Sequence, residues 1–214
     1  VEIGYVVRDM QIIIENSNNK RPKLILPPDL CVIAGTRIEE IIQGEDPDGD
    51  GIKIEVFGEP MEINVSPATY DPANVFQVQP GIVNFDWQTV CNHVREREYE
   101  VRIRITDQPR SGPKLVDIQT WRIKVIGPPP IWDALEQLPG RSVELNWDPY
   151  ACANSAEKMQ VWRRINSDPY LPDSCETGIR AGYELIGSTD MATFSFTDAN
   201  GGEGLAPGNT YCYR

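Results

Sequence analysis

Hydrophobic and polar residues alternate with a period of two along most of this 214-residue chain. The clearest run covers residues 98–106, where Tyr99, Val101, Ile103 and Ile105 are separated by charged side chains. A period of two places one set of side chains on a buried face and the other in water. The run is therefore predicted to be a strand that packs on a core with one face.

Similar short runs, separated by turn signals, fill two stretches of the chain. In the first stretch they are predicted at 23–26, 30–34, 37–43, 52–57, 75–79, 81–85, 98–106 and 115–126. In the second they are predicted at 142–147, 159–164, 183–186 and 193–197. No amphipathic helix with start and stop signals interrupts the first stretch. The pattern predicts an all-β fold made of tandem β-sandwich domains.

Two polar or proline-rich breaks set the expected domain boundaries. Residues 1–20 hold a run rich in β-branched side chains followed by a polar linker, and we interpret them as the last strand of a preceding sandwich. Three prolines after Gly127 favour a semi-rigid extended spacer. The domains are therefore predicted at 21–127 and 128–214.

Charge and hydropathy narrow the partners. The net charge is −12 and the sequence pI is about 4.6, so no basic surface is available for nucleic acid or for an anionic membrane. No apolar run approaches the length of a membrane span, and no signal peptide opens the chain. We expect an internal segment of a longer, mature protein without direct membrane insertion.

The five cysteines point to an oxidising compartment. They contain no C-x-x-C pair, and the chain has one histidine, so the usual zinc sites lack ligands. Widely spaced cysteines in strand-rich sequence favour disulfides and an extracytoplasmic location. The alternative, scattered buried thiols of a cytosolic protein, stays open at this point. Because five is odd, one cysteine has no partner within this sequence.

An acidic loop is the candidate metal site. Asp46, Asp48 and Asp50 alternate with Pro47 and glycines, which lets their oxygens converge on calcium. An EF-hand is excluded because its twelfth position is Phe57 and the following residues favour a strand. Two interpretations stay open: a calcium site that Glu15 and Asn18 complete from the linker, or a solvated turn rich in Asp and Gly.

Catalysis is not expected. A Cys91–His93 pair lacks an orienting third group, and the paired carboxylates fall on turns or outward strand faces. Among the tryptophans, Trp147 is predicted in the core, Trp132 between domains, and Trp162 on an outer face where it could stack on a sugar. We predict a protein that is not an enzyme, with surface glycans or other cell-surface proteins as candidate partners.

The C-terminal stretch resembles a fibronectin type III domain. The matching residues are Leu145 and Trp147 in strand B, Val161 in strand C, and Leu205, Pro207, Gly208, Tyr211 and Tyr213 at the corner between strands E and F. The resemblance implies that a corner tyrosine reaches back to the backbone. It also implies that the chain stops within strand F, that strand G is absent, and that Cys152 pairs with Cys175 across an insertion at residues 150–182.

The middle stretch resembles cadherin-like and immunoglobulin-like sandwiches. The resemblance rests on three motifs and a linker: Glu45 to Asp48 as the acidic calcium motif, Val94 to Glu96 as the D-R-E motif, Thr106-Asp107 before the last strand, and Asn18 to Pro22. It implies calcium at the junction with the preceding domain. We pair Cys31 with Cys91 within this domain and leave Cys212 without a mate.

The whole chain resembles the repeat region of large surface proteins of gliding, Bacteroidota-type bacteria that the type IX secretion system exports. The matching stretches are 87–91, 150–152, 175–179 and 200–205. The resemblance implies a secreted, disulfide-bonded adhesion or spacer module on the outer face of a Gram-negative bacterium, with neighbouring domains of the same chain as partners. The alternative is an accessory carbohydrate-binding region of a secreted polysaccharide-degrading enzyme.

Overall fold

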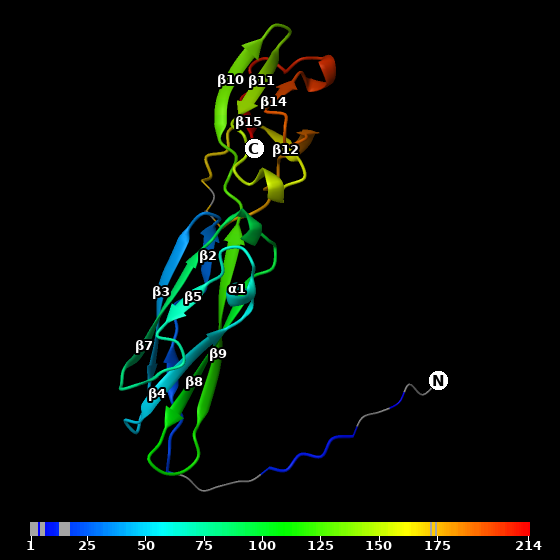
Figure 1. Cartoon of the computed structure of the whole chain (residues 1–214). Helices are drawn as coiled ribbons and strands as arrows, with labels where there is room; N and C mark the ends of the chain where they lie inside the picture. The colour runs from blue at the N-terminus through cyan, green and yellow to red at the C-terminus, as the bar shows by residue number, and fades with distance from the viewer. Residues whose placement is uncertain (1–3, 5–6, 13–17, 172, 174) are drawn as a thin grey trace.

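The computed structural model describes residues 4, 7–12, 18–171, 173 and 175–214. These form two β-sandwiches in tandem (Figure 1), so the predicted all-β fold is confirmed. Residues 7–12 have no assigned strand. Because 1–3, 5–6 and 13–17 lie outside the described residues, the interpretation of 1–20 as the end of a preceding domain stays a prediction.

The N-terminal sandwich has a four-stranded and a five-stranded sheet. The first contains, in spatial order, β1 (Lys23–Ile25), β3 (Arg37–Glu45), β7 (Gly81–Gln88) and β5 (Thr69–Asp71). The second contains β2 (Leu30–Ile33), β9 (Val116–Ile126), β8 (Tyr99–Gln108), β4 (Gly51–Phe57) and β6 (Phe76–Gln77). Strand β5 and the one-turn helix α1 (Glu59–Glu62) were not predicted.

Parallel pairing of β2 with β9 extends the five-stranded sheet by one edge strand, whereas the other strand pairs described in both sheets are antiparallel. The predicted alternation in β8 is confirmed, because its four apolar residues from Tyr99 to Ile105 are at most 3% exposed. The pleat therefore places one face of β8 in the core.

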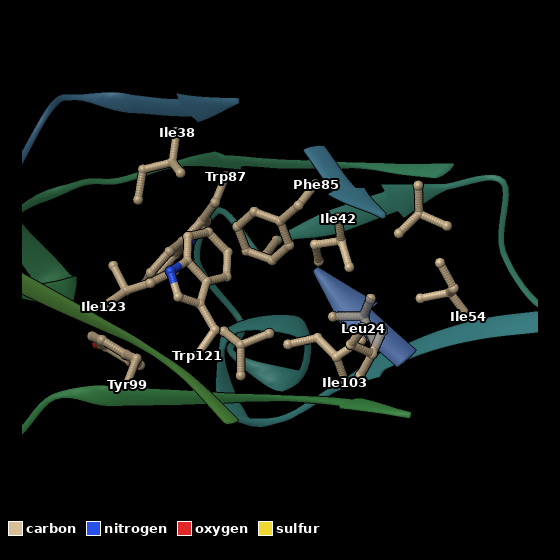
Figure 2. Close-up of a cluster of buried hydrophobic side chains, with 14 of the residues drawn as sticks. Leu24, Ile38, Ile42, Ile54, Phe85, Trp87, Tyr99, Ile103, Trp121 and Ile123 are labelled. Atoms are coloured by element: carbon tan, nitrogen blue, oxygen red, sulfur yellow. The ribbon is translucent and has the colours of Figure 1, made fainter. Parts of the chain in front are cut away.

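The core of this sandwich is large and aromatic (Figure 2). Trp87 and Trp121 are essentially fully buried, and each indole N–H donates to a backbone carbonyl, of Ser66 at 3.0 Å and Pro28 at 2.8 Å. Phe85 meets Trp121 edge-on at 5.1 Å between ring centroids. Satisfied indole N–H groups allow these rings to be buried without the cost of an unpaired donor.

The C-terminal sandwich is smaller, with two three-stranded sheets. One contains β10 (Trp132–Leu138), β11 (Ser142–Trp147) and β14 (Ser195–Asp198); the other contains β13 (Glu184–Thr189), β12 (Met159–Ile165) and β15 (Tyr211–Tyr213). Strand β10 was not predicted. Short 3₁₀ turns lie at Cys91–His93 (η1), Ala153–Ser155 (η2) and Asn200–Gly202 (η3).

A small apolar cluster and one buried ion pair join the two layers of this sandwich. The cluster consists of Val143, Leu145, Trp147, Val161 and Leu205, so the predictions that Trp147 and the strand B and C residues lie inside are confirmed. In the ion pair, Arg163 of β12 donates from Nη1 to both carboxylate oxygens of Asp198 at 3.1 Å. Both side chains are buried, so removing either partner would leave an uncompensated charge inside the domain.

The corner before β15 has the predicted tyrosine. The Tyr211 hydroxyl accepts a hydrogen bond from the Ala206 N–H at 2.9 Å and donates to the Ala206 carbonyl at 3.3 Å. This contact fixes the turn that leads into β15.

Among the residues that the structure describes, no helix has the length and apolar character needed to cross a membrane.

Candidate functional site

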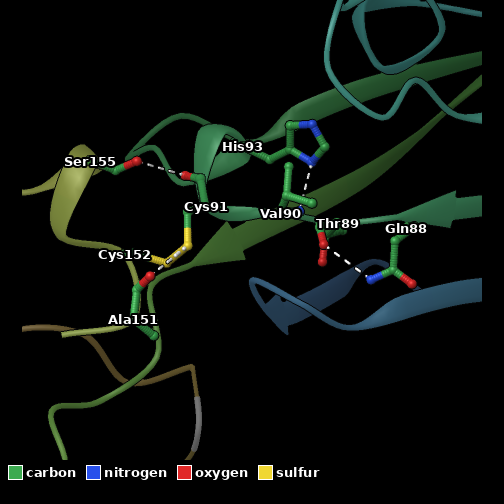
Figure 3. The surroundings of a disulfide bond; sticks show 8 residues. All are labelled: Gln88, Thr89, Val90, Cys91, His93, Ala151, Cys152 and Ser155. Carbon is green, nitrogen blue, oxygen red and sulfur yellow. Dashed lines mark hydrogen bonds between the residues drawn. A yellow bond between two sulfur atoms is a disulfide. The ribbon is translucent and has the colours of Figure 1, made fainter. Parts of the chain in front are cut away.

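Two disulfide bonds cross the junction between the two sandwiches. Cys31 in β2 bonds to Cys175 in the C-terminal sandwich, with 6.0 Å between their Cα atoms. Cys91 in η1 bonds to Cys152, with 5.3 Å between their Cα atoms (Figure 3). Both disulfides therefore connect one sandwich to the other.

The predicted pairs Cys31–Cys91 and Cys152–Cys175 are wrong. Each prediction joined cysteines of the same domain, because a sequence gives no direct information on which cysteines meet in space. The fold instead places β2 and η1 at the end of the N-terminal sandwich that faces the second domain (Figures 1 and 3). Cys212, the fifth cysteine, has a free thiol.

Non-covalent contacts reinforce the junction around Cys91. The Ser155 hydroxyl of η2 donates to the Cys91 carbonyl at 3.1 Å (Figure 3). Gly127, the last residue before the prolines, lies against the Tyr150 hydroxyl, and a Cβ at this position would collide with it. Burial raises the pKa of Tyr150. The proline-rich linker that begins at Gly127 therefore packs against the second sandwich.

The insertion that carries Cys175 is held by a buried carboxylate. Asp168 accepts hydrogen bonds from the Tyr170 N–H at 3.4 Å and the Tyr183 hydroxyl at 3.1 Å. It also forms ion pairs with Arg164, Arg180 and Arg214 at 3.3–3.7 Å. Burial alone would raise the pKa of Asp168, but these hydrogen bonds and positive charges outweigh it and lower the pKa. One carboxylate thus anchors the loop from which the Cys31–Cys175 bridge starts.

The acidic loop, residues 46–50, lies at the end of the N-terminal sandwich that is remote from the second sandwich. It is next to the N-terminal linker, residues 18–22. Asp46 is buried, and its Oδ1 accepts hydrogen bonds from the N–H groups of Asp48 and Asp50 at 2.9 and 3.3 Å. The Gln79 side chain donates to the carbonyls of Asp46 and Asp50 at 2.9 and 3.0 Å. The run is therefore a tight Asp-rich turn. The Gln79 side chain, from the loop between β6 and β7, closes it.

The same turn also binds the N-terminal linker, residues 18–22. The Asp48 carboxylate accepts from the Lys20 N–H at 2.6 Å and pairs with the Lys20 ammonium at 3.2 Å. Asn19 donates to Asp107, which is fully buried, at 2.6 Å. Burial and the nearby carboxylates of Asp46, Asp107 and Asp48 raise the pKa of Asp50.

The predicted calcium ligands do not form a complete cage. Asp48, Asp50 and Asn18 line one shallow hollow of about 500 Å³, and Asp46 is not among its lining residues. The Oδ2 atom of Asp46 is buried and has no hydrogen-bond partner among the described residues. Glu15 lies outside the described residues. Across the part of the chain that the structure describes, no group of three or more His, Cys, Asp or Glu side chains is placed to hold a metal ion. The carboxylate of Asp107 joins this acidic group without having been predicted as a ligand.

The structure leaves no catalytic Cys–His pair at residues 91–93. Cys91 is oxidised, and both ring nitrogens of His93 are engaged: Nδ1 accepts from the Val90 N–H at 3.1 Å and Nε2 donates to the Val65 carbonyl at 2.8 Å. His93 is buried against Trp87 at 4.9 Å between ring centroids. Its role is to support the turn that carries Cys91.

The remaining tryptophans lie in different surroundings. Trp162 is half-buried on the outer face of β12, opposite Leu185 in register, with its indole N–H directed to the Gln160 carboxamide at 3.3 Å. Trp132 is 47% exposed and meets Trp147 edge-on at 6.1 Å. Its contact with Trp147 lies within the C-terminal sandwich.

No protein-family model and no curated protein matches this chain. Among solved structures, it is similar to the sialic acid binding region of a Streptococcus sanguinis adhesin, with 14% identity, a TM-score of 0.39, and coverage of 52% of this chain and 31% of that one. It is also similar to the SrpA adhesin of the same species, with 18% identity, a TM-score of 0.36, and coverage of 52% and 60%. A titin segment is 14% identical, with a TM-score of 0.35 and coverage of 92% and 60%.

The chain thus spans less than two thirds of the length of these structures. Likenesses this weak carry no argument about binding or partners.

Proposed function

We propose that this chain is an extracellular structural and adhesion segment of a large bacterial surface protein, in which it acts as a stiff spacer that presents other domains. The observation that supports the proposal is the pair of disulfides, Cys31–Cys175 and Cys91–Cys152, that cross the same domain junction. Structural disulfides are typical of oxidising, extracytoplasmic compartments. The gliding-bacterial, type IX-exported origin rests on the sequence resemblance alone.

Two bridges restrain a junction more than one. A single disulfide between two domains leaves rotation about the bridge, whereas two separated attachment points remove most of that freedom. The two attachment points on the N-terminal sandwich lie in regular structure, because Cys31 is in a strand and Cys91 is in a turn that His93 supports. The three prolines after Gly127 limit the remaining freedom of the linker.

The test is the distribution of distances between the two sandwiches. Spin labels attached through a non-cysteine handle at Ile118 of β9 and Glu136 of β10 report this distance by pulsed electron paramagnetic resonance. We expect a narrow distribution in the intact chain and a broad one in the variant in which Cys31, Cys91, Cys152 and Cys175 are all serine. Cys212→Ser is the matched control, with the distribution unchanged. Equally broad distributions in all three proteins would contradict a spacer role.

We further propose calcium as a ligand of the acidic turn. The support is electrostatic: burial and the nearby carboxylates of Asp46, Asp107 and Asp48 raise the pKa of Asp50, and one oxygen of Asp46 is buried without a partner among the described residues. A cation with oxygen preference would offset this repulsion and stiffen the attachment of the linker.

A thermal melt in millimolar calcium and again in EDTA tests the metal. We expect calcium to raise the melting temperature of the wild type and to have no effect on the Asp46→Asn/Asp48→Asn variant. Asp117→Asn, a change at a half-buried carboxylate on β9 outside the acidic turn, is the control that should keep the calcium response. An unchanged melting temperature of the wild type in calcium would mean that the acidic turn binds no calcium and only holds the N-terminal linker.

The carbohydrate-binding alternative rests on Trp162. Its ring lies half-buried on an outer sheet face beside Leu185 and Arg214, a surrounding in which a sugar could stack. Glycan-array binding that Trp162→Ala abolishes, with the fold intact by circular dichroism, would favour this function over the spacer. An array without any bound glycan would remove it.

A further inference from the structure

The outer face of the five-stranded sheet is basic, which the net charge of −12 does not reveal. The pleat directs alternate residues of β4, β8 and β9 away from the core. Five basic and two acidic side chains occupy these outward positions: Lys53, Arg102, Arg104, Arg122 and Lys124, against Glu55 and Glu100. The face therefore has an excess of positive charge on a chain that is acidic as a whole.

Two of these arginines are available to an outside partner. The side chains of Arg102 and Arg122 are 64% and 49% exposed. Among the described residues, Arg102 forms one ion pair, with Glu100 at 3.8 Å, and Arg122 forms two, with Asp29 and Glu98 at 3.9 Å. These distances are longer than a hydrogen bond, so most of the guanidinium N–H donors remain for a carboxylate of another molecule.

An exposed isoleucine lies among the charges of this face. Ile118 opposes Arg104 in register and is 58% exposed. Arg104 and Lys53 share the buried carboxylate of Glu55, at 2.8 and 3.4 Å. The centre of the face is thus partly neutralised, and covering Ile118 with an apolar surface would remove its side chain from water.

The outer face of the four-stranded sheet lies on the opposite side of the same sandwich and is acidic. Its outward positions in β1, β3, β7 and β5 hold two basic and four acidic side chains: Lys23 and Arg37, against Glu39, Glu45, Asp71 and Asp86. Arg37 pairs with Asp86 at 2.5 Å and with Glu39 at 3.6 Å, and the Glu39 side chain stays 68% exposed. This face therefore has an excess of negative charge.

Three isoleucines form an apolar patch within the acidic face. Gln43 lies between Ile25 and Ile82 in register, and Ile41 lies two residues before Gln43 on the same face of β3. Ile25, Ile82 and Ile41 are 49%, 37% and 58% exposed. Exposed apolar patches with a polar rim are typical of interaction surfaces.

The C-terminal sandwich covers neither face. Figure 1 shows the two sandwiches end to end, so the second extends the first instead of lying on its sheets. Stacking two like faces would bring like charges together, whereas stacking unlike faces brings arginines to carboxylates and isoleucine to isoleucine. At about 0.15 M salt the Debye length is about 8 Å, so charges far from such a contact repel only weakly.

We propose that copies of this chain stack through their N-terminal sandwiches, with the five-stranded sheet of one copy on the four-stranded sheet of the next. The exposed arginines approach the surplus carboxylates, and Ile118 packs on the isoleucine patch around Gln43. Each copy in the stack keeps one free face of each kind, so the contact is head-to-tail and can extend into a row. The partner is therefore a second copy of this chain.

Sedimentation velocity of the full chain over a range of concentrations, at about 0.15 M salt, tests the contact. Cys212→Ser is present throughout, so that no dimer forms through that thiol. Arg102→Glu and Glu39→Lys should each weaken self-association about tenfold. Lys158→Glu and Glu136→Lys make the same two charge changes at exposed residues of the C-terminal sandwich and should leave the association unchanged.

A mixture of the two weakened variants tests the head-to-tail geometry. Arg102→Glu keeps its four-stranded face intact, and Glu39→Lys keeps its five-stranded face intact. The mixture should therefore form mixed pairs with the affinity of the wild type, although neither variant associates well alone. A contact between two like faces would give no such recovery, because one of the two variants would then be unaffected from the start.

Photo-cross-linking locates the partner surface without altering either charge. A benzoylphenylalanine in place of Ile118 should link to β3 or β7 of another copy, as identified by mass spectrometry. The same group in place of Leu171, which is 89% exposed, should give no link to these strands.

Four results would overturn the inference. They are a wild type that stays monomeric up to millimolar concentration, equal weakening by the C-terminal control variants, a mixture without recovery, and links from position 118 that avoid the four-stranded sheet. None of them would affect the proposed spacer role, which concerns stiffness within a single chain and is measured on isolated molecules.

Discussion

The inward-facing leucine of an edge strand is buried in one sandwich and exposed in the other. Leu24 of β1 is 8% exposed, whereas Leu135 of β10 is 62% exposed. In the N-terminal sandwich, β9 and the parallel strand β2 extend the second sheet across β1. Among the described residues of the C-terminal sandwich, the second sheet has three strands, and Leu135 of β10 stays exposed. In the part of the chain that the structure describes, the exposure of the inward leucine therefore follows the extent of the opposing sheet and not the apolar character of the leucine itself.

Loss of both interdomain disulfides should have the largest effect on the difference in stability between the two sandwiches. Each disulfide tethers the unfolded C-terminal segment to a folded neighbour and contributes about 3 kcal/mol on the chain-entropy account. The fourfold serine variant should therefore lose about 6 kcal/mol in the C-terminal sandwich, while the N-terminal sandwich stays folded. Hydrogen exchange resolved by segment measures both. Equal loss of protection in the two domains would contradict the contrast.

Removal of one core tryptophan from each sandwich comes next. Trp147→Ala should cost about 3–5 kcal/mol and unfold the C-terminal sandwich, because its buried apolar cluster has few other members. Trp121→Ala should cost a similar amount but leave the larger N-terminal core folded. Urea titration followed by domain-resolved hydrogen exchange checks both. Survival of the C-terminal sandwich in Trp147→Ala would show that the bridges alone support it.

The junction can be strained without touching either core. Gly127→Ala should destabilise the chain by about 1–3 kcal/mol, because the added methyl group collides with the Tyr150 hydroxyl. Tyr150→Phe removes that hydroxyl and should restore most of the loss in the double variant. Thermal unfolding of the four proteins gives the coupling. Additive effects of the two substitutions would show that the contact does not form.

The smallest effect concerns pH. The pKa of Asp168 is lowered in the folded protein: burial opposes the shift, but hydrogen bonds and arginines outweigh it. Its contribution to stability is therefore complete above the unfolded pKa, about 3.9, and is lost as the pH falls through the lower, folded value. The protection of the backbone amides of the insertion against hydrogen exchange, relative to the unfolded chain at the same pH, should fall in that acidic range.

Asp168→Asn should show this mobility at neutral pH, whereas Asp133→Asn, an exposed change on β10, should not. Unchanged exchange of the insertion between pH 5 and pH 2.5 would remove Asp168 as its anchor.

Local patterns predicted the strands well where the pleat decides burial. The alternation of Tyr99, Val101, Ile103 and Ile105 predicted β8, and the Pro-Gly corner predicted the Tyr211 contact with Ala206. Strand β10 was missed because its inward residues are interrupted by a bulge between Trp132 and Ala134, which breaks the period of two. The one-turn helix α1 was too short to show a helical period.

Pairing across the chain could not be predicted in the same way. The disulfide partners were assigned within each domain, and both pairs are wrong, since the meeting of Cys31 with Cys175 depends on how the two sandwiches face each other. Likewise, Asp107 joins the acidic turn from a distant strand, and Asp168 gathers three arginines that lie far apart in the sequence.

The sequence by itself determined the all-β class, the alternating faces of the strands and the tyrosine corner, because these follow from side-chain periodicity and from turn chemistry over a few residues. Only the tertiary structure decided which cysteines bond and which carboxylates cluster. Those features depend on contacts between segments tens of residues apart, and such contacts are set by the packing of whole sheets and domains rather than by any local pattern.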